Sequence, residues 1–354
     1  MIPHLVTPAK EAVIELAPRP PDPSFVIPAQ AGTQGFQSVT LDPRFRGGDG
    51  EETGEASAWF ALITMPAPLS TAFLIAFHGL AFAMVLYLIS VGLSVTMGMM
   101  GFVNLAHGVF AMAGGYVLTG LMNRYGVPMA AALAAATIAV AVASLPIERI
   151  LYRRLYGGDE LDQVLLTMGL VFMSGAAAQY LCGALQQPLR LPPALNGGVR
   201  LGFGNVPLYD LLLIVCGALL VTLLWLGIER SRFGAKIRAA VDNLRMAQSI
   251  GIDTSRLFAL SFALGSGLAA LGGGLGAALI TIAPSYALDN LVYFLIVVAI
   301  GGLGNLRGPF FAAVVVGLAD SVCKYLVPQF GAFLIYAMTM AMLLWRPRGL
   351  FGRA

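Results

Sequence analysis

The stretch that decides the fold spans residues 257–280 and reads LFALSFALGSGLAALGGGLGAALI. It contains no charged residue and no alternation of polar and apolar residues. An α-helix rises about 1.5 Å per residue, so roughly 20 apolar residues cross the hydrocarbon layer of a bilayer. Because backbone polar groups in lipid must be paired within their own segment, such a run predicts a membrane-spanning helix.

Similar runs fill most of the chain. Hydrophobic residues make up 58% of the sequence and charged residues 11%, whereas soluble domains carry about 25% charged residues. We expect spans at residues 70–96, 100–122, 128–147, 164–185, 208–228, 257–280 and 331–345, with a glycine-broken region at 290–325. The broken region holds either two short spans or one span and a re-entrant piece. The expected fold is therefore an all-α transmembrane bundle of eight or nine spans.

Residues 1–65 differ from this pattern, because they are rich in Pro, Gly and charged residues. The run PRPPDP at residues 18–23 cannot continue a helix. A signal peptide would show a basic segment followed by an apolar one, and residues 1–65 contain no such pattern. We expect residues 1–65 to be a disordered extension and residues 66–354 to be the transmembrane domain. One hypothesis places the working start at Met65, and the alternative is an ordinary flexible tail.

The positive charges indicate an orientation. Of the seventeen Lys and Arg residues after residue 65, thirteen lie in one alternating set of loops and four in the other. The richer set includes the loops 148–163 and 229–256 and the C-terminal tail. Since short loops rich in Lys and Arg mark the cytoplasmic side, we expect these loops and the C-terminus to be cytoplasmic.

The loop 229–256 has an apolar face at helical spacing, formed by Phe233, Ile237, Val241, Leu244 and Ala247. Gly251 is expected to stop this helix, and Asp253 or Thr254 to cap the next one. A basic amphipathic helix of this kind either lies on anionic lipid or fits a groove on a cytoplasmic partner. The residues leave both interpretations open.

Two segments with a Gly-Asn pattern interrupt the apolar runs. GFVNLAHGVF at residues 101–110 and GLGNLRGPFF at residues 302–311 align without gaps and share four identities. Interrupted segments in corresponding places indicate a transport pathway built from an internal repeat, although a chance match is the alternative. The pathway candidates are Asn104, His107, Gly108, Asn305 and Arg307. Polar groups within spans are functional candidates by default, but Asn104 and His107 could instead hold two helices together.

The remaining polar residues carry less information. Asp320 and Lys324 are spaced for an ion pair within one helix, and His78 is expected to serve packing. The sequence has no G-x-x-x-x-G-K-[ST] phosphate loop, so we expect no bound ATP. We expect no metal site, no cofactor and no catalytic residue.

Four motifs together identify a family resemblance. They are GFVNLAHG at 101–108, GAKIRA at 234–239, GGLGN at 301–305 and RPRGLFG at 346–352. With them, residues from about 70 to 354 resemble the first of the two membrane permeases of bacterial branched-chain amino acid ABC importers.

The resemblance implies an inner-membrane permease that receives its solute from a periplasmic binding protein. It also implies a second, related permease and two cytoplasmic ATPase subunits that bind the ATP, and it implies no nucleic acid partner. Loop 229–256 would be the element that couples to the ATPases, with Arg238, Asn243 and Gly251 as its candidate residues. The alternatives are an ion-coupled secondary transporter, which would need carboxylates within spans, and an ABC permease for urea or short amides.

Overall fold

The structure is a computed structural model that describes residues 69–101, 103–156, 158–201, 204–302, 304, 306–346 and 349–351. The chain divides into two units, Met1–Ser57 and Ala58–Ala354, and all described residues lie in the second. The expected N-terminal extension and the candidate residue Asn305 lie outside the described residues.

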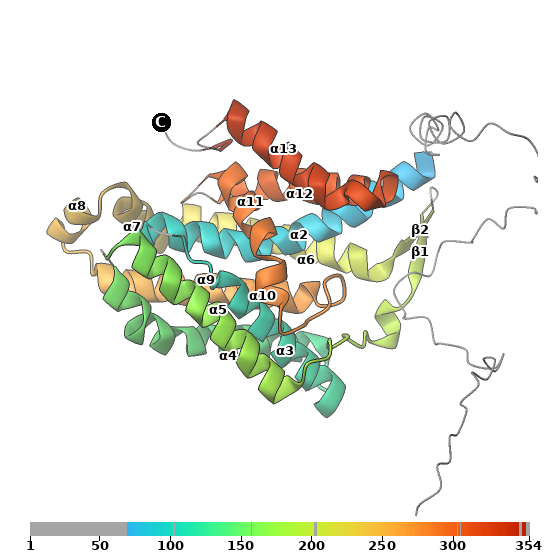
Figure 1. The fold of residues 1–354 in the computed structure, drawn as a ribbon, viewed down its shortest axis with the longest axis horizontal. Coiled ribbons are helices and arrows are strands. Elements are labelled where there is room, and N and C mark those ends of the chain that lie inside the picture. The colour runs from blue at the N-terminus through green and yellow to red at the C-terminus, as the bar shows by residue number, and fades with distance from the viewer. Residues whose placement is uncertain are drawn as a thin grey trace, which may run out of the picture. The chain divides into compact units, whose positions relative to one another are not determined.

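The described part is built of helices and one small hairpin (Figure 1). The α-helices are α2 (Leu69–Met100), α3 (His107–Tyr125), α4 (Met129–Ile150), α5 (Glu160–Cys182), α6 (Leu208–Leu224), α7 (Arg232–Asp242), α8 (Leu244–Ser249), α9 (Thr254–Gly276), α10 (Tyr286–Asp289), α11 (Leu291–Gly301), α12 (Arg307–Leu326) and α13 (Gly331–Trp345). Short 3₁₀ turns are η1 (Tyr152–Leu155), η2 (Pro193–Leu195) and η4 (Pro328–Phe330), and η3 (Trp225–Glu229) is a π-helical turn that continues α6.

Six helices in the described part are long and apolar enough to cross a membrane. They are Thr71–Gly98, Met129–Ile150, Glu160–Cys182, Leu208–Ile228, Thr254–Gly276 and Arg307–Leu326. Two shorter apolar helices, Tyr286–Gly301 and Phe333–Trp345, add to them. The expectation of an all-α membrane bundle is therefore confirmed, whereas the number of spans stays a prediction.

Helix α9 forms the core of the bundle, because α2, α3 and α4 all pack against it. In its apolar window 72% of the residues are buried, compared with 17% in α5. A Cβ atom at Gly92 of α2 would overlap the carbonyl of Gly265, and one at Gly273 would overlap the carbonyl of Ala111 in α3. The glycines of residues 257–280 thus let backbones approach more closely than any larger residue would allow.

The bundle has two ends, defined by the direction of its helices. Gly92 lies against Gly265 and Val85 against Gly276, so α2 and α9 are antiparallel. The α7 end comprises α7, α8, the start of α9 and the end of α2, and the hairpin end carries strands β1 (Gly198–Leu201) and β2 (Gly204–Pro207) (Figure 1). The strands are antiparallel, with Val199 opposite Val206. This hairpin was not expected from the sequence.

Both expected interruptions are present as breaks in helical structure. Helix α2 ends at Met100 and α11 ends at Gly301. The next residues, Gly101 and Gly302, have φ angles of 74° and 92°, which only glycine adopts readily. The span expected at 100–122 is helical only from His107 onward, and the region 290–325 divides into α11, of 11 residues, and α12, of 20 residues.

The C-terminal residues fold back onto α11. The amide of Leu350 donates to the carbonyl of Ile300 at 2.7 Å, and Gly349 makes this turn with a φ of 78°. The ring of Phe351 stacks on Phe311 of α12 at a centroid distance of 5.5 Å. The end of α11 is therefore capped by the chain itself.

Candidate functional site

Asn104 organises the first interruption. Its side chain is buried, and its Oδ1 accepts hydrogen bonds from the Ala106 amide at 3.1 Å and from the Tyr152 hydroxyl at 2.9 Å. The first bond is the local turn that Asn favours, and the second ties the segment to the residues after α4. Within the described residues its Nδ2 has no partner. The Asn104 side chain thus ties the start of α3 to the turn after α4.

His107 places the start of α3 inside the bundle. Its Nε2 lies 3.0 Å from the carbonyl oxygen of Ile89, so Nε2 carries the proton and donates. Ile89 precedes the end of α2 by eleven residues, so the chain returns along α2 before α3 begins. Among the described residues, Nδ1 of His107 is without a hydrogen bond.

Gly108, near the start of α3, lets α10 and the start of α11 pack closely against it. A Cβ atom there would lie 3.1 Å from the carbonyl oxygen of Ala287 in α10 and 3.4 Å from the ring of Phe294 in α11. Helix α11 has 11 residues and is about 16 Å long, roughly half the hydrocarbon thickness. Helix α3, of 19 residues, and the half-length helix α11 therefore begin close to each other in the interior.

The second interruption is held by its backbone. The amide of Gly304 donates to the carbonyl of Ser94 in α2 at 3.1 Å, and Oγ of Ser94 donates to the carbonyl of Gly302 at 3.2 Å. A Cβ atom at Gly304 would lie 3.2 Å from Cγ1 of Val241 in α7. Arg307 is exposed, and its guanidinium lies over the ring of Trp225 at 5.5 Å.

The loop 229–256 forms two helices, α7 and α8, where the sequence predicted one. The break falls at Asn243, which has a φ of −155° and accepts a hydrogen bond from the Met246 amide at 3.0 Å. Asn243 therefore caps α8 instead of continuing α7. Because of this break Leu244, expected on the apolar face, is 37% exposed, whereas Ile237 and Ala247 are buried.

Helix α7 is attached to several other elements at once. Ile237 and Ala240 pack with Val95 of α2 and with Leu257 and Phe258 of α9. In addition, Nη1 of Arg238 donates to the carbonyl of Ile228 at 3.2 Å, within the π-helical turn after α6. Such turns are frequent at functional sites.

Gly251 ends this segment as predicted. Its φ is 84°, and it comes directly after Ile250, the C-cap of α8. The side chain of Asp253 then accepts from the Arg256 amide at 3.0 Å, which makes Asp253 the cap of α9. The structure confirms the expected helix stop and cap.

One ion pair lies within α12, and a second polar contact connects α2 with α6. Lys324 contacts Asp320 at 2.7 Å, as the spacing predicted. His78, however, does more than pack, because its Nδ1 lies 2.9 Å from Oδ2 of Asp210. Asp210 and Asp320 are both buried, and each contacts a His or Lys side chain. Within the described chain, no group of three or more His, Cys, Asp or Glu could hold a metal ion.

Comparison with known proteins agrees with the resemblance. The family described as "Branched-chain amino acid transport system / permease component" matches residues 75–343. The high-affinity branched-chain amino acid transport system permease protein BraD of Pseudomonas aeruginosa is 28% identical over 292 residues, which covers 78% of this chain and 94% of that protein. LivH of Escherichia coli K12 is 26% identical with the same coverage, and a probable LivH of Methanocaldococcus jannaschii is 26% identical over 73% of this chain and 84% of that protein. No solved structure matches significantly.

Proposed function

This chain belongs to the family of permease components of branched-chain amino acid transport systems, and we propose that it is one of two membrane subunits of an ABC importer for such amino acids. Members of this family are transport proteins, so the chain is not an enzyme. Relatives named for branched-chain amino acid transport, matched over most of their length, support the proposed cargo.

The proposed importer contains three further kinds of subunit. A second permease completes the pathway, two cytoplasmic ATPases bind and hydrolyse the ATP, and a periplasmic binding protein delivers the solute. The sequence has no phosphate loop of its own, which fits a chain that leaves ATP hydrolysis to partners.

The α7 end faces the cytoplasm in this proposal, with the C-terminus on the same side. Seven arginines lie on or beside the elements of this end, as the positive-inside rule predicts for a cytoplasmic side. They are Arg149, Arg153, Arg230, Arg232, Arg238, Arg245 and Arg256. Nine crossings follow if α3 completes a crossing with the residues that precede it, and α11 completes one with α10 and the residues before α10. The aligned positive-φ glycines, Gly101 and Gly302, favour an internal repeat.

The packing of α7 carries the coupling proposal. An ATPase that moves α7 and α8 would act on α2 through Ile237 and on α6 through Arg238. It would act on the second interruption through Val241, which faces Gly304. One docking element thus reaches three parts of the bundle, so its movement can open or close the cytoplasmic side.

The first interruption has a different role in this proposal. Asn104, His107 and Gly108 fix the point from which α3 starts, beside the start of α11. Within the described part of the chain, Nδ2 of Asn104 and Nδ1 of His107 make no hydrogen bond, which leaves capacity for a water molecule or a changed partner during transport.

The test is ATP-driven uptake by the four-subunit complex in proteoliposomes with the binding protein added. Arg238→Glu combined with Gly251→Pro should abolish leucine uptake while membrane insertion and ATP hydrolysis persist. Arg190→Glu, an exposed site near the hairpin end, is the matched control and should transport normally. Normal uptake by the double variant would refute the coupling role.

The cargo and the energy source are tested in the same vesicles. Excess unlabelled isoleucine or valine should compete with leucine, and urea or acetamide should not. Uptake by this chain alone on an ion gradient would instead establish the secondary-transporter alternative.

A further inference from the structure

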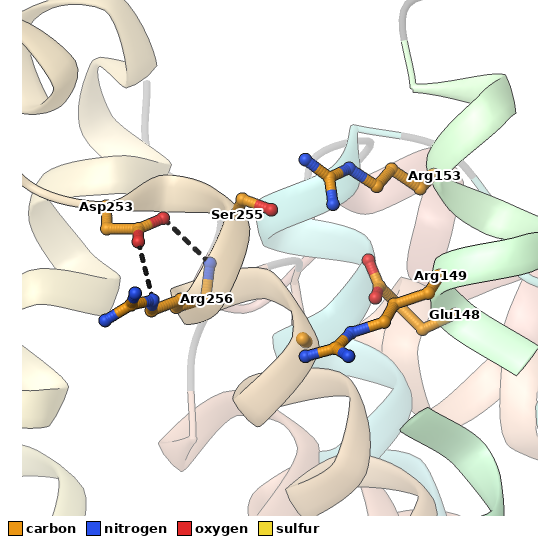
Figure 2. Close-up of a pocket in the computed structure, with 7 residues that line it drawn as sticks. Glu148, Arg149, Arg153, Asp253, Ser255 and Arg256 are labelled. Carbon is orange, nitrogen blue, oxygen red and sulfur yellow. Dashed lines mark hydrogen bonds and ion pairs between the residues drawn. The ribbon is translucent and has the colours of Figure 1, made fainter. Parts of the chain in front are cut away.

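A cavity opens at the α7 end, between the end of α4 and the start of α9. Its volume is about 410 Å³. Figure 2 shows side chains from both sides directed toward this space. The lining residues are Glu148, Arg149, Arg153, Asp253, Ser255, Arg256 and Ala259. None of them belongs to the interruptions or to α7.

The charges of the lining are unevenly matched. Asp253 is engaged with Arg256, whose Nε lies 2.9 Å from its carboxylate and whose amide it also caps. Glu148 is buried and accepts a 2.7 Å hydrogen bond from the Tyr156 hydroxyl. Burial and this carboxylate raise the pKa of Tyr156, so its hydroxyl stays protonated and donates.

Two arginines remain. Within the described residues, neither Arg149 nor Arg153 makes a hydrogen bond or an ion pair, and both are exposed. With Asp253 and Arg256 neutralising each other, Arg149 and Arg153 against Glu148 leave the lining with one net positive charge. A ligand with a single negative charge would neutralise it.

We propose that this cavity binds a phosphate group, and that the phosphate is the diester of a phospholipid headgroup. Guanidinium groups bind phosphate oxygens through paired, charge-assisted hydrogen bonds, and a phosphodiester carries one negative charge. The Ser255 hydroxyl supplies a further donor from the first turn of α9.

The outer face of α4 explains why the phosphate comes from lipid. The exposed positions of this helix from residue 131 to 146 carry only Ala, Ile, Val and Pro. Ile138 and Val142 are 63% and 59% exposed on this face, and at helical spacing Pro146 and then Arg149 follow as exposed positions. An acyl chain can therefore lie along α4 while its headgroup enters the cavity. Basic pockets between helices at the membrane surface bind lipid headgroups in this way.

The experiment measures the Tm of the full chain in maltoside micelles with added ligand. We expect phosphatidylglycerol to raise the Tm by about 5 °C at saturation, and diacylglycerol with the same chains, which lacks the phosphate, to have little effect. Arg149→Gln combined with Arg153→Gln should weaken phosphatidylglycerol binding about tenfold. The matched control, Arg124→Gln combined with Arg190→Gln at two exposed arginines near the hairpin end, should bind as the unmodified chain does.

A second variant separates loss of the binding site from misfolding of the double variant. Ser255→Glu puts a carboxylate into the cavity at the first turn of α9, where a negative charge favours the helix. It should fold normally and also lose the lipid effect.

Inorganic phosphate, as a third probe, distinguishes a soluble phosphate ligand from a lipid headgroup. If it reproduces the shift, and Ser255→Glu abolishes this, the phosphate site stands and the ligand is soluble. The proposal is overturned if phosphatidylglycerol and inorganic phosphate change the Tm of the unmodified chain, the double variant and Ser255→Glu alike. It is also overturned if diacylglycerol raises the Tm as much as phosphatidylglycerol does.

Discussion

The two interruptions, 101–106 and 302–306, share a sequence pattern but are held in different ways. In the first, Asn104 and His107 make specific side-chain bonds to Tyr152 and Ile89. In the second, the bond from Gly304 to Ser94 joins two backbones, and Gly304 also faces α7. The first interruption is thus tied by side chains of its own residues, whereas the second is tied through its glycine backbone to Ser94, whose Oγ donates to Gly302. We therefore propose that the first interruption acts as an anchor, and the second as a joint that α7 can move.

The largest expected effect concerns the anchor. Asn104→Leu removes the oxygen that accepts hydrogen bonds from the buried Ala106 amide and from the buried Tyr152 hydroxyl. Losing a hydrogen bond at a buried polar group costs about 1–3 kcal/mol, so we expect the free energy of unfolding to fall by about 3 kcal/mol. Thermal unfolding in detergent measures this loss. Asn243→Leu, which removes an exposed cap, should cost only about 1 kcal/mol. Equal stability of both variants would contradict the anchor.

Gly304→Ala tests the joint. A left-handed φ of 70° costs a non-glycine residue about 1–2 kcal/mol, and the added Cβ would press on Val241. We expect the complex to hydrolyse ATP but to transport less leucine per ATP. Adding Val241→Ala should restore part of the transport, because it removes the contact although not the strain. If Gly304→Ala leaves the leucine-to-ATP ratio unchanged, this segment does not transmit the movement of α7.

Tyr152→Phe sharpens the comparison by removing one bond of the anchor. The Asn104 side chain keeps its bond to Ala106, so the loss should be about 1 kcal/mol. Combined with Asn104→Leu, it should cost little more than Asn104→Leu alone, because both remove the same bond. Tyr180→Phe, at a residue 89% exposed, is the control and should be neutral. Fully additive losses would show that the two residues act independently.

The smallest effect is expected at Arg307. Its interaction with Trp225 is exposed, and such contacts contribute about 0.5–1 kcal/mol. Arg307→Gln should therefore lower stability by about 0.5 kcal/mol and change leucine uptake less than twofold. Trp225→Leu should give a similar loss. A collapse of uptake in Arg307→Gln would move this residue from the surface of the joint into the pathway itself.

Features determined by local sequence were predictable. The long apolar runs gave the helices at 128–147, 208–228 and 257–280, and local signals gave the cap at Asp253, the stop at Gly251 and the pair of Asp320 with Lys324. Contacts between distant segments were not predictable. His78 meets Asp210 across 132 residues and Tyr152 meets Asn104 across 48. The late start of α3 follows from the bond of His107 to Ile89, which no hydrophobic pattern reveals.

The turn at Gly349 and Leu350 determines how this protein can be handled at the bench. A truncation before Gly349 would remove the Leu350 amide, which donates to the Ile300 carbonyl, and the Phe351 ring, which stacks on Phe311. Affinity tags and fluorescent reporters therefore belong beyond Phe351, on a spacer long enough to leave this clasp closed.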